Sequence, residues 1–268
     1  MPTTDAIFTI RFVGPELKVH GMPIYELGAA FIAIQRLFHK AHLSETEKLT
    51  KGKYPEKAVR KRLALQIGAH ERRSDFFGLV PIVTDPSARE AISSAAEFVY
   101  DVIKSYAAKK VLDVLKTEKD ESKQVYIGSV QADVVNIVNR IGNTGGCESI
   151  EIGAPHYAPQ QVLELDSGIR DYVRMLGHEY FLGKSQELVG DVFKLYPNLG
   201  MVEVRRKSGK RKCKVFFLEE KDFERVRLSK NPSPRISVYG RPRYRLGAEG
   251  RAFTEFEGQA LREVEDEG

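Results

Sequence analysis

The residues best placed to do chemistry in this sequence are basic and lie toward its carboxyl end. Residues 201–251 include 16 Lys and Arg against 6 Asp and Glu, a net charge of +10. Cations bind phosphate oxygens and aromatic rings stack on unpaired bases, so this mixture indicates contact with DNA or RNA. The candidate nucleic-acid-binding residues flank one predicted hairpin and follow a later strand: Arg205, Arg206, Lys207, Lys210, Arg211, Lys212, Lys214, Arg235, Tyr239, Arg241, Arg243, Tyr244 and Arg245.

The excess positive charge is confined to this segment. Residues 1–200 carry 25 basic and 25 acidic residues, whereas residues 252–268 carry 1 basic and 6 acidic residues. Such asymmetry indicates a polyanionic partner, an acidic protein surface, or pairing of the acidic end with the chain's own basic face. The sequence leaves both binding and internal neutralisation open.

A weaker pattern could carry catalysis. Glu219 and Lys221 form an E-x-K string at a predicted strand end, and Asp191 is the upstream carboxylate that could join them. A metal-dependent nuclease holds a divalent cation between such carboxylates and uses the lysine to stabilise developing charge. The string arises by chance in most charged proteins, so a polar strand end is the favoured interpretation. We expect no catalytic residues and no cofactor.

Three other patterns have simpler explanations. His39 and His42 lack the glutamate of the zinc-protease signature, and we expect them to cap a helix end, whose negative pole favours imidazolium. Arg72 and Arg73 lie at a predicted hairpin tip, where charged residues are the norm. The loop at 143–146 follows a helix and precedes a strand, the reverse of a phosphate-binding loop.

The elements that must position these residues begin with a predicted α+β domain at 1–120, with two long helices against a small antiparallel sheet. Residues 7–13 alternate with period two, as a half-buried strand does. An apolar stripe with helical spacing predicts a helix at about 24–43. Asp85 followed by Pro86 is a typical start for the second long helix. Further strands are predicted at 16–20, 63–69 and 76–83.

A polar run at 117–123 is the best candidate for a domain boundary. After it we predict a mainly helical middle at 121–185, with one strand at 148–152 and helical material from 158 to 181. Hydrophobic alternation then predicts five or six short strands over 186–258. Such a series is typical of a small barrel, OB-like or SH3-like. The acidic residues at 259–268 are expected to form a tail.

Composition also indicates the cellular compartment in which the protein works. The amino-terminal stretch MPTTDAIFTIRFVG lacks the features of a secretory signal, and no apolar run approaches the roughly 18 residues of a membrane span. Cys147 and Cys213 are too few for a disulfide framework, which favours a reducing compartment. We therefore expect a folded cytoplasmic protein.

Two stretches of the amino-terminal part resemble known proteins. They are HGMPIYELGAAFIAIQRLFHKA at 20–41 and LALQIGAHERRSDFFGLVPIV at 63–83. With the long helix that follows them, they look like the opening of poorly characterised bacterial proteins, some of which are encoded among anti-phage defence genes. The resemblance covers roughly the first 115 residues and transfers no catalytic residue. It implies an accessory or sensor protein in a bacterial multi-protein system.

Taken together, these patterns predict a non-catalytic nucleic-acid-binding accessory or sensor protein that also contacts a protein partner or a second copy of itself. One alternative is a self-associating or partner-docking structural subunit that binds no nucleic acid. A third hypothesis, the least favoured, is the metal-dependent nuclease.

Overall fold

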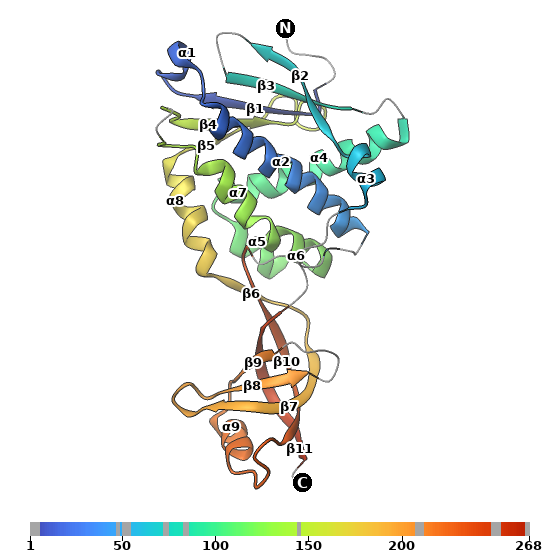
Figure 1. The fold of residues 1–268 in the computed structure, drawn as a ribbon, viewed down its shortest axis with the longest axis vertical. Helices are drawn as coiled ribbons and strands as arrows, with labels where there is room; N and C mark the ends of the chain where they lie inside the picture. The colour runs from blue at the N-terminus through green and yellow to red at the C-terminus, as the bar shows by residue number, and fades with distance from the viewer. Residues whose placement is uncertain are drawn as a thin grey trace. The chain divides into compact units, whose positions relative to one another are not determined.

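The chain folds into two compact units (Figure 1). The structure, a computed structural model, describes residues 6–46, 49, 55–71, 75–82, 86–143, 146–206, 212–247 and 253–265. The first unit is Met1–Glu179 with Leu246–Gly250, and the second is Tyr180–Arg245 with Arg251–Gly268. Residues 117–123, the boundary expected from the sequence, lie inside the first unit. Within the described residues, no helix has the length and apolar character needed to cross a membrane.

The first unit is built on a five-stranded antiparallel sheet with the order β2-β3-β1-β4-β5. Its central strand shows the predicted alternation, with Phe8, Ile10 and Phe12 buried and Arg11 exposed. The strands are β1 (Phe8–Val13), β2 (Leu65–Glu71), β3 (Asp75–Pro81), β4 (Ser149–Gly153) and β5 (Val162–Leu165). With α2 between β1 and β2, and α4 among the helices between β3 and β4, the strand order is that of the ferredoxin-like βαββαβ motif.

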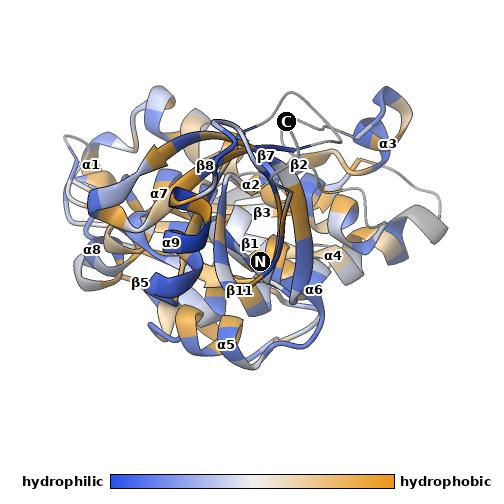
Figure 2. Ribbon diagram, turned by 90° about the horizontal axis from the view of Figure 1, so that it is seen from below, coloured by the Kyte–Doolittle hydropathy of each residue, from blue (hydrophilic) through white to orange (hydrophobic). Residues whose placement is uncertain are grey.

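Helices pack on one face of this sheet (Figure 1), and aromatic rings join the two layers. The ring of Phe38 on α2 lies 5.8 Å from that of Phe8 on β1, edge to face. Blue and orange stretches alternate along α5, as expected for a helix with one buried side (Figure 2). The helices are α1 (Leu17–His20), α2 (Ile24–Glu45), α3 (Lys57–Arg62), α4 (Pro86–Ala107), α5 (Val111–Thr117), α6 (Glu121–Ser129), α7 (Gln131–Val138) and α8 (Ser167–Met175), with the 3-10 turn η1 (Leu176–His178).

Two predicted elements of the first unit are wrong. The expected strand at 16–20 is helix α1, because five residues are too few for alternation to be distinguished from one helical turn. The expected helix at 158–181 contains β5 before α8. Asp166 sets the start of α8, since its carboxylate accepts a hydrogen bond from the Ile169 N–H at 2.8 Å.

The predicted role of His39 as a charged helix cap is also wrong. Helix α2 continues to Glu45, which leaves His39 outside the last turn. Burial, together with the nearby positive charge of Arg60, lowers the pKa of its imidazole. His39 therefore favours the neutral form, and its ring lies 3.2 Å from the amide nitrogen of Gln35.

A buried ion cluster joins α2 to α6 and α7. The Asp133 carboxylate is fully buried and lies 3.1 Å from Arg36 Nε and 2.7 Å from Lys40 Nζ. Lys40 also donates a hydrogen bond to the Ser129 carbonyl at 2.7 Å. Burial and the Asp133 charge raise the pKa of Tyr126 well above its ordinary value, so that its hydroxyl stays protonated. The cluster therefore fixes the positions of α2, α6 and α7 relative to one another.

Asp133→Asn should lower the free energy of unfolding by about 3–5 kcal/mol, because it leaves the Lys40 ammonium buried without a countercharge. Denaturant unfolding followed by circular dichroism measures the change. Asp113→Asn, at an exposed position on α5, is the matched control and should stay within about 0.5 kcal/mol of the parent. Equal effects of the two substitutions would show that the cluster does not stabilise the unit.

The second unit is a closed five-stranded barrel, which confirms the predicted α+β class and carboxy-terminal barrel. Its strands pair in the circular order β7-β8-β9-β11-β10-β7, parallel between β9 and β11 and antiparallel elsewhere. A helix, α9, separates the third and fourth strands. This connectivity is that of the OB fold and not of an SH3-like barrel. The elements are β7 (Gln186–Tyr196), the 3-10 turn η2 (Pro197–Leu199), β8 (Met201–Arg206), β9 (Lys212–Phe217), α9 (Glu220–Arg227), β10 (Arg235–Arg245) and β11 (Glu255–Glu265), and β6 (Tyr180–Leu182) pairs with the end of β10.

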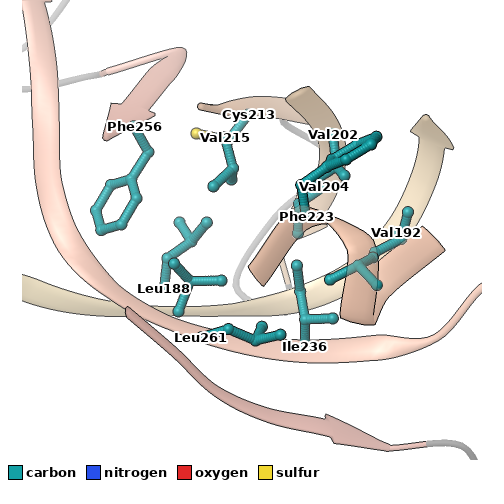
Figure 3. Packing of buried hydrophobic residues seen from close by; sticks show 12 residues of the cluster. Leu188, Val192, Val202, Val204, Cys213, Val215, Phe223, Ile236, Phe256 and Leu261 are labelled. Carbon is teal, nitrogen blue, oxygen red and sulfur yellow. The ribbon is translucent and has the colours of Figure 1, made fainter. Parts of the chain in front are cut away.

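The barrel core is apolar and includes residues of all five barrel strands and α9 (Figure 3). Phe223 and Val226 of α9 are buried in it, and the Asp222 carboxylate accepts a hydrogen bond from the Leu261 N–H of β11 at 2.9 Å. Strand β11 continues to Glu265, so the acidic residues up to that position lie in the barrel wall. The tail expected at 259–268 is thus part of a strand as far as the structure describes it.

Candidate nucleic-acid interface

Alternation along the barrel strands separates the basic side chains from the core. On β8, Val202 and Val204 are fully buried, whereas Arg205, which follows them, is exposed. On β9, Cys213 and Val215 are fully buried, and the lysines on either side of Cys213 are exposed. Arg205, Lys212 and Lys214 therefore lie on the outer surface of two neighbouring strands.

A β-bulge on β7 adds an aromatic ring to this surface. Val192 pairs with Val204 and Lys194 pairs with Glu203, which leaves Phe193 as the extra residue. Its side chain is 50% exposed, an unusual position for a large apolar ring.

Two cations lie over the Phe193 ring. Lys212 Nζ is 3.5 Å from the ring centroid and Arg205 Cζ is 5.2 Å from it. Lys194, the next residue of β7, lies over the Tyr196 ring at 4.6 Å. We call Phe193, Lys194, Arg205, Lys212 and Lys214 the Phe193 face.

Phe193 and Lys194 were not predicted from the sequence, because both precede the basic segment at 201–251. A signal was nevertheless present. Val192 and Phe193 are adjacent apolar residues, which breaks period-two alternation. The pairs at 188–189 and 195–196 break it as well, so this signal does not single out the bulge.

Charges of opposite sign alternate around the barrel wall. One row of cross-strand pairs has Glu203 on β8 between two lysines and Glu255 on β11 between a lysine and an arginine. Opposite charges in such pairs stabilise a sheet by about 0.2–1 kcal/mol each. The row is Lys194, Glu203, Lys214, Glu255 and Arg243.

A second row, beside the first, is arranged in a similar way. Asp191 on β7 pairs with Arg205 on one side and Arg235 on the other, and Arg235 also pairs with Glu265. Lys212 follows Arg205 in the same row, so the only like-charged neighbours of these two rows lie next to Phe193. The second unit as a whole keeps a positive excess, with 19 basic and 13 acidic residues.

The basic residues on β10 are held by the protein itself. Arg243 Nη2 lies 3.1 Å from Glu257 and Arg245 Nη2 lies 2.5 Å from Glu255. Arg241 donates hydrogen bonds to the carbonyls of residues 182 and 183. Arg243 and Arg245 thus link β10 to β11, and Arg241 links β10 to the end of β6. Arg243 is the more buried of the two ion-paired arginines, whereas the Arg245 side chain is 60% exposed.

Two predicted binding residues point into the barrel. Tyr244 is buried and stacks on Phe181 with ring centroids 5.2 Å apart, so its predicted role as an exposed stacking residue is wrong. Arg206 donates a hydrogen bond to the Phe253 carbonyl, and its guanidinium lies 3.8 Å from the Phe253 ring centroid. Burial raises the pKa of the neighbouring Cys213 thiol, against the opposing effect of Arg206.

The predicted residues thus do not form one continuous surface. Strand β10 pairs with β7 and β11 and not with β8 or β9. Arg235 lies across Asp191 of β7 from Arg205, whereas Arg243 lies opposite Glu255 of β11 and Leu182 of β6, with its guanidinium 4.6 Å from the Phe216 ring centroid. Tyr239 is 37% exposed, with Arg262 5.2 Å from its ring centroid. Lys207, Lys210 and Arg211 lie outside the described residues.

The residues proposed for a nuclease do not assemble into a metal centre. Asp191 lies in β7 between two arginines, whereas Glu219 is the cap residue before α9. Lys221 Nζ lies 4.0 Å from the Glu219 carboxylate, and both side chains are exposed. Across the part of the chain that the structure describes, no three His, Cys, Asp or Glu side chains are grouped so that they could hold a metal ion.

Comparison with known proteins adds no family assignment. No protein-family model, no curated protein and no solved structure matches this chain.

Arg243→Gln should lower the free energy of unfolding by about 1.5–3 kcal/mol, because it leaves the mostly buried Glu257 carboxylate without its charged partner. Arg205→Gln should change it by less than about 0.5 kcal/mol, since Arg205 is exposed and has no ion pair among the described residues. Denaturant unfolding of both variants measures the difference. A larger loss of stability for Arg205→Gln than for Arg243→Gln would contradict the conclusion that Arg243 is paired within the protein while Arg205 is free to contact a ligand.

Proposed function

We propose that this chain is a non-catalytic protein that binds single-stranded nucleic acid through the Phe193 face, as an accessory or sensor component. The observation that carries the proposal is one exposed aromatic ring among exposed cations on the β7–β8–β9 side of an OB barrel. Barrels of this topology bind oligonucleotides on the surface of their second and third strands, here β8 and β9.

The arrangement favours single strands over duplexes. A base can stack on Phe193 only if its face is free, and in a duplex both faces are covered by neighbouring base pairs. Adjacent strands lie about 5 Å apart, so long cationic side chains on neighbouring strands can follow one phosphate backbone. An aromatic platform among cations thus fits a ligand that is both anionic and unstacked.

Internal neutralisation limits the number of phosphate contacts. The Phe193 face has Lys194, Arg205, Lys212 and Lys214, and each phosphate contact contributes about −0.7 to the slope of log K against log salt for a single strand. A complete set of contacts would therefore give a slope near −3.

Binding of a fluorescent oligonucleotide of mixed sequence should weaken as salt rises, with a slope of about −2 to −3. Arg205→Gln combined with Lys214→Gln should make that slope shallower by about 1.4, because two contacts are lost. Lys184→Gln, at an exposed lysine of the same unit that precedes β7 and is nine residues from Phe193, is the control. Binding that is independent of salt, or equally reduced by the control, would contradict the proposal.

Phe193→Ala should weaken binding of the same oligonucleotide by about 1–3 kcal/mol, the usual contribution of one stacked base. Tyr239→Ala is the matched control, since it removes an exposed ring with a cation above it from another part of the barrel wall. Fluorescence anisotropy measures both affinities. If Tyr239→Ala costs as much as Phe193→Ala, the ligand does not use the β7–β8–β9 surface.

A second candidate function is docking through the first unit without nucleic acid. Three large apolar side chains of α2 are strongly exposed: Ile24 at 88%, Tyr25 at 80% and Ile32 at 64%. Exposed apolar patches of this kind often mark protein contacts. The salt titration separates the two functions, because a protein that only docks would bind no oligonucleotide at any salt concentration.

A further inference from the structure

The most informative side chain of the Phe193 face is an acidic one. Glu203 lies in the middle of β8, paired across the sheet with Lys194 on one side and Lys214 on the other. One carboxylate oxygen lies 3.3 Å from Lys212 Nζ, and the other accepts a hydrogen bond from the Tyr196 hydroxyl at 3.2 Å. Its side chain is only 15% exposed, so the carboxylate lies below its lysine neighbours.

Lys212 is consequently held by two partners at once. Its ammonium contacts the Glu203 carboxylate and lies 3.5 Å from the Phe193 ring centroid. A base stacking on that side of the ring needs the space that the ammonium occupies. A phosphate that binds Lys212 must displace the ammonium from the Glu203 carboxylate.

We propose that Glu203 competes with a bound strand for Lys212 and thereby lowers the affinity of the Phe193 face for polyanions. In the unbound protein Glu203 holds Lys212 on the ring of Phe193. On binding, the ammonium of Lys212 moves from Glu203 to a phosphate and frees the ring for a base. This inference rests on the proposed function and extends it to the control of the same site.

Base stacking on Phe193 and phosphate contact with Lys212 therefore depend on each other, because both require Lys212 to leave the ring. A ligand with phosphates but no free base faces, such as a duplex, gains a contact to Lys212 but nothing from the freed ring. An unstacked strand gains both. Glu203 lowers the affinity for both ligands, and only the unstacked strand offsets that cost by stacking on Phe193.

Glu203→Gln is the direct test, because glutamine keeps an oxygen that can accept the hydrogen bond from Tyr196 while it removes the charge that holds Lys212. The mixed-sequence single strand should bind about two- to fivefold more tightly, the range expected when one exposed ion pair no longer competes. The salt slope should stay close to that of the parent, since Lys212 contacts a phosphate in both complexes. A duplex of the same sequence should gain by about the same factor, since both ligands take Lys212 from Glu203.

Glu220→Gln is the matched control, since it removes an equal charge from the exposed start of α9. In a Lys212→Gln background, Glu203→Gln should improve binding no more than the control does. Unchanged or weaker binding by Glu203→Gln, while the parent protein binds normally, overturns the inference alone. Failure of the parent and of every variant to bind overturns the proposed function, and the inference falls with it.

Discussion

The closure of the barrel by β11 is the constraint on which the rest of the second unit depends. This strand lies between β9 and β10, parallel to one and antiparallel to the other, and it brings a row of carboxylates between two basic strands. Without β11, β9 and β10 would each have an unpaired edge, and Arg243 and Arg245 of β10 would lack the carboxylates that pair with them. With it, Arg243 and Arg245 have partners, and the barrel has no unpaired edge to protect.

Closure also decides which cations are left for a ligand. The carboxylates of β11 reach β10 and the near side of β9, whereas β7 and β8 receive only Asp191 and Glu203 in the two charge rows. Positive charge is therefore least compensated next to the bulge on β7, where Phe193 is exposed. The position of the Phe193 face follows from strand pairing as much as from the number of arginines and lysines.

The first unit is stabilised by a different device. Its helices are held together by a fully buried carboxylate with two cationic partners, an arrangement that tolerates little change because each partner would be costly to leave unpaired. The exposed apolar residues of α2 lie on the same helix as Arg36 and Lys40 of this cluster. A rigid helix is a suitable support for contacts with another protein.

The sequence by itself determined the local elements and the direction of many side chains. Alternation predicted β1 and the barrel strands, and the same parity would have placed Arg206 with Val204 and Tyr244 with Val238 inside the barrel. Only the tertiary structure decided which strands are neighbours, since cross-strand pairs join residues far apart in the chain and periodicity is the same whichever partner is chosen. That pairing neutralised β10 and left Phe193 and its cations exposed.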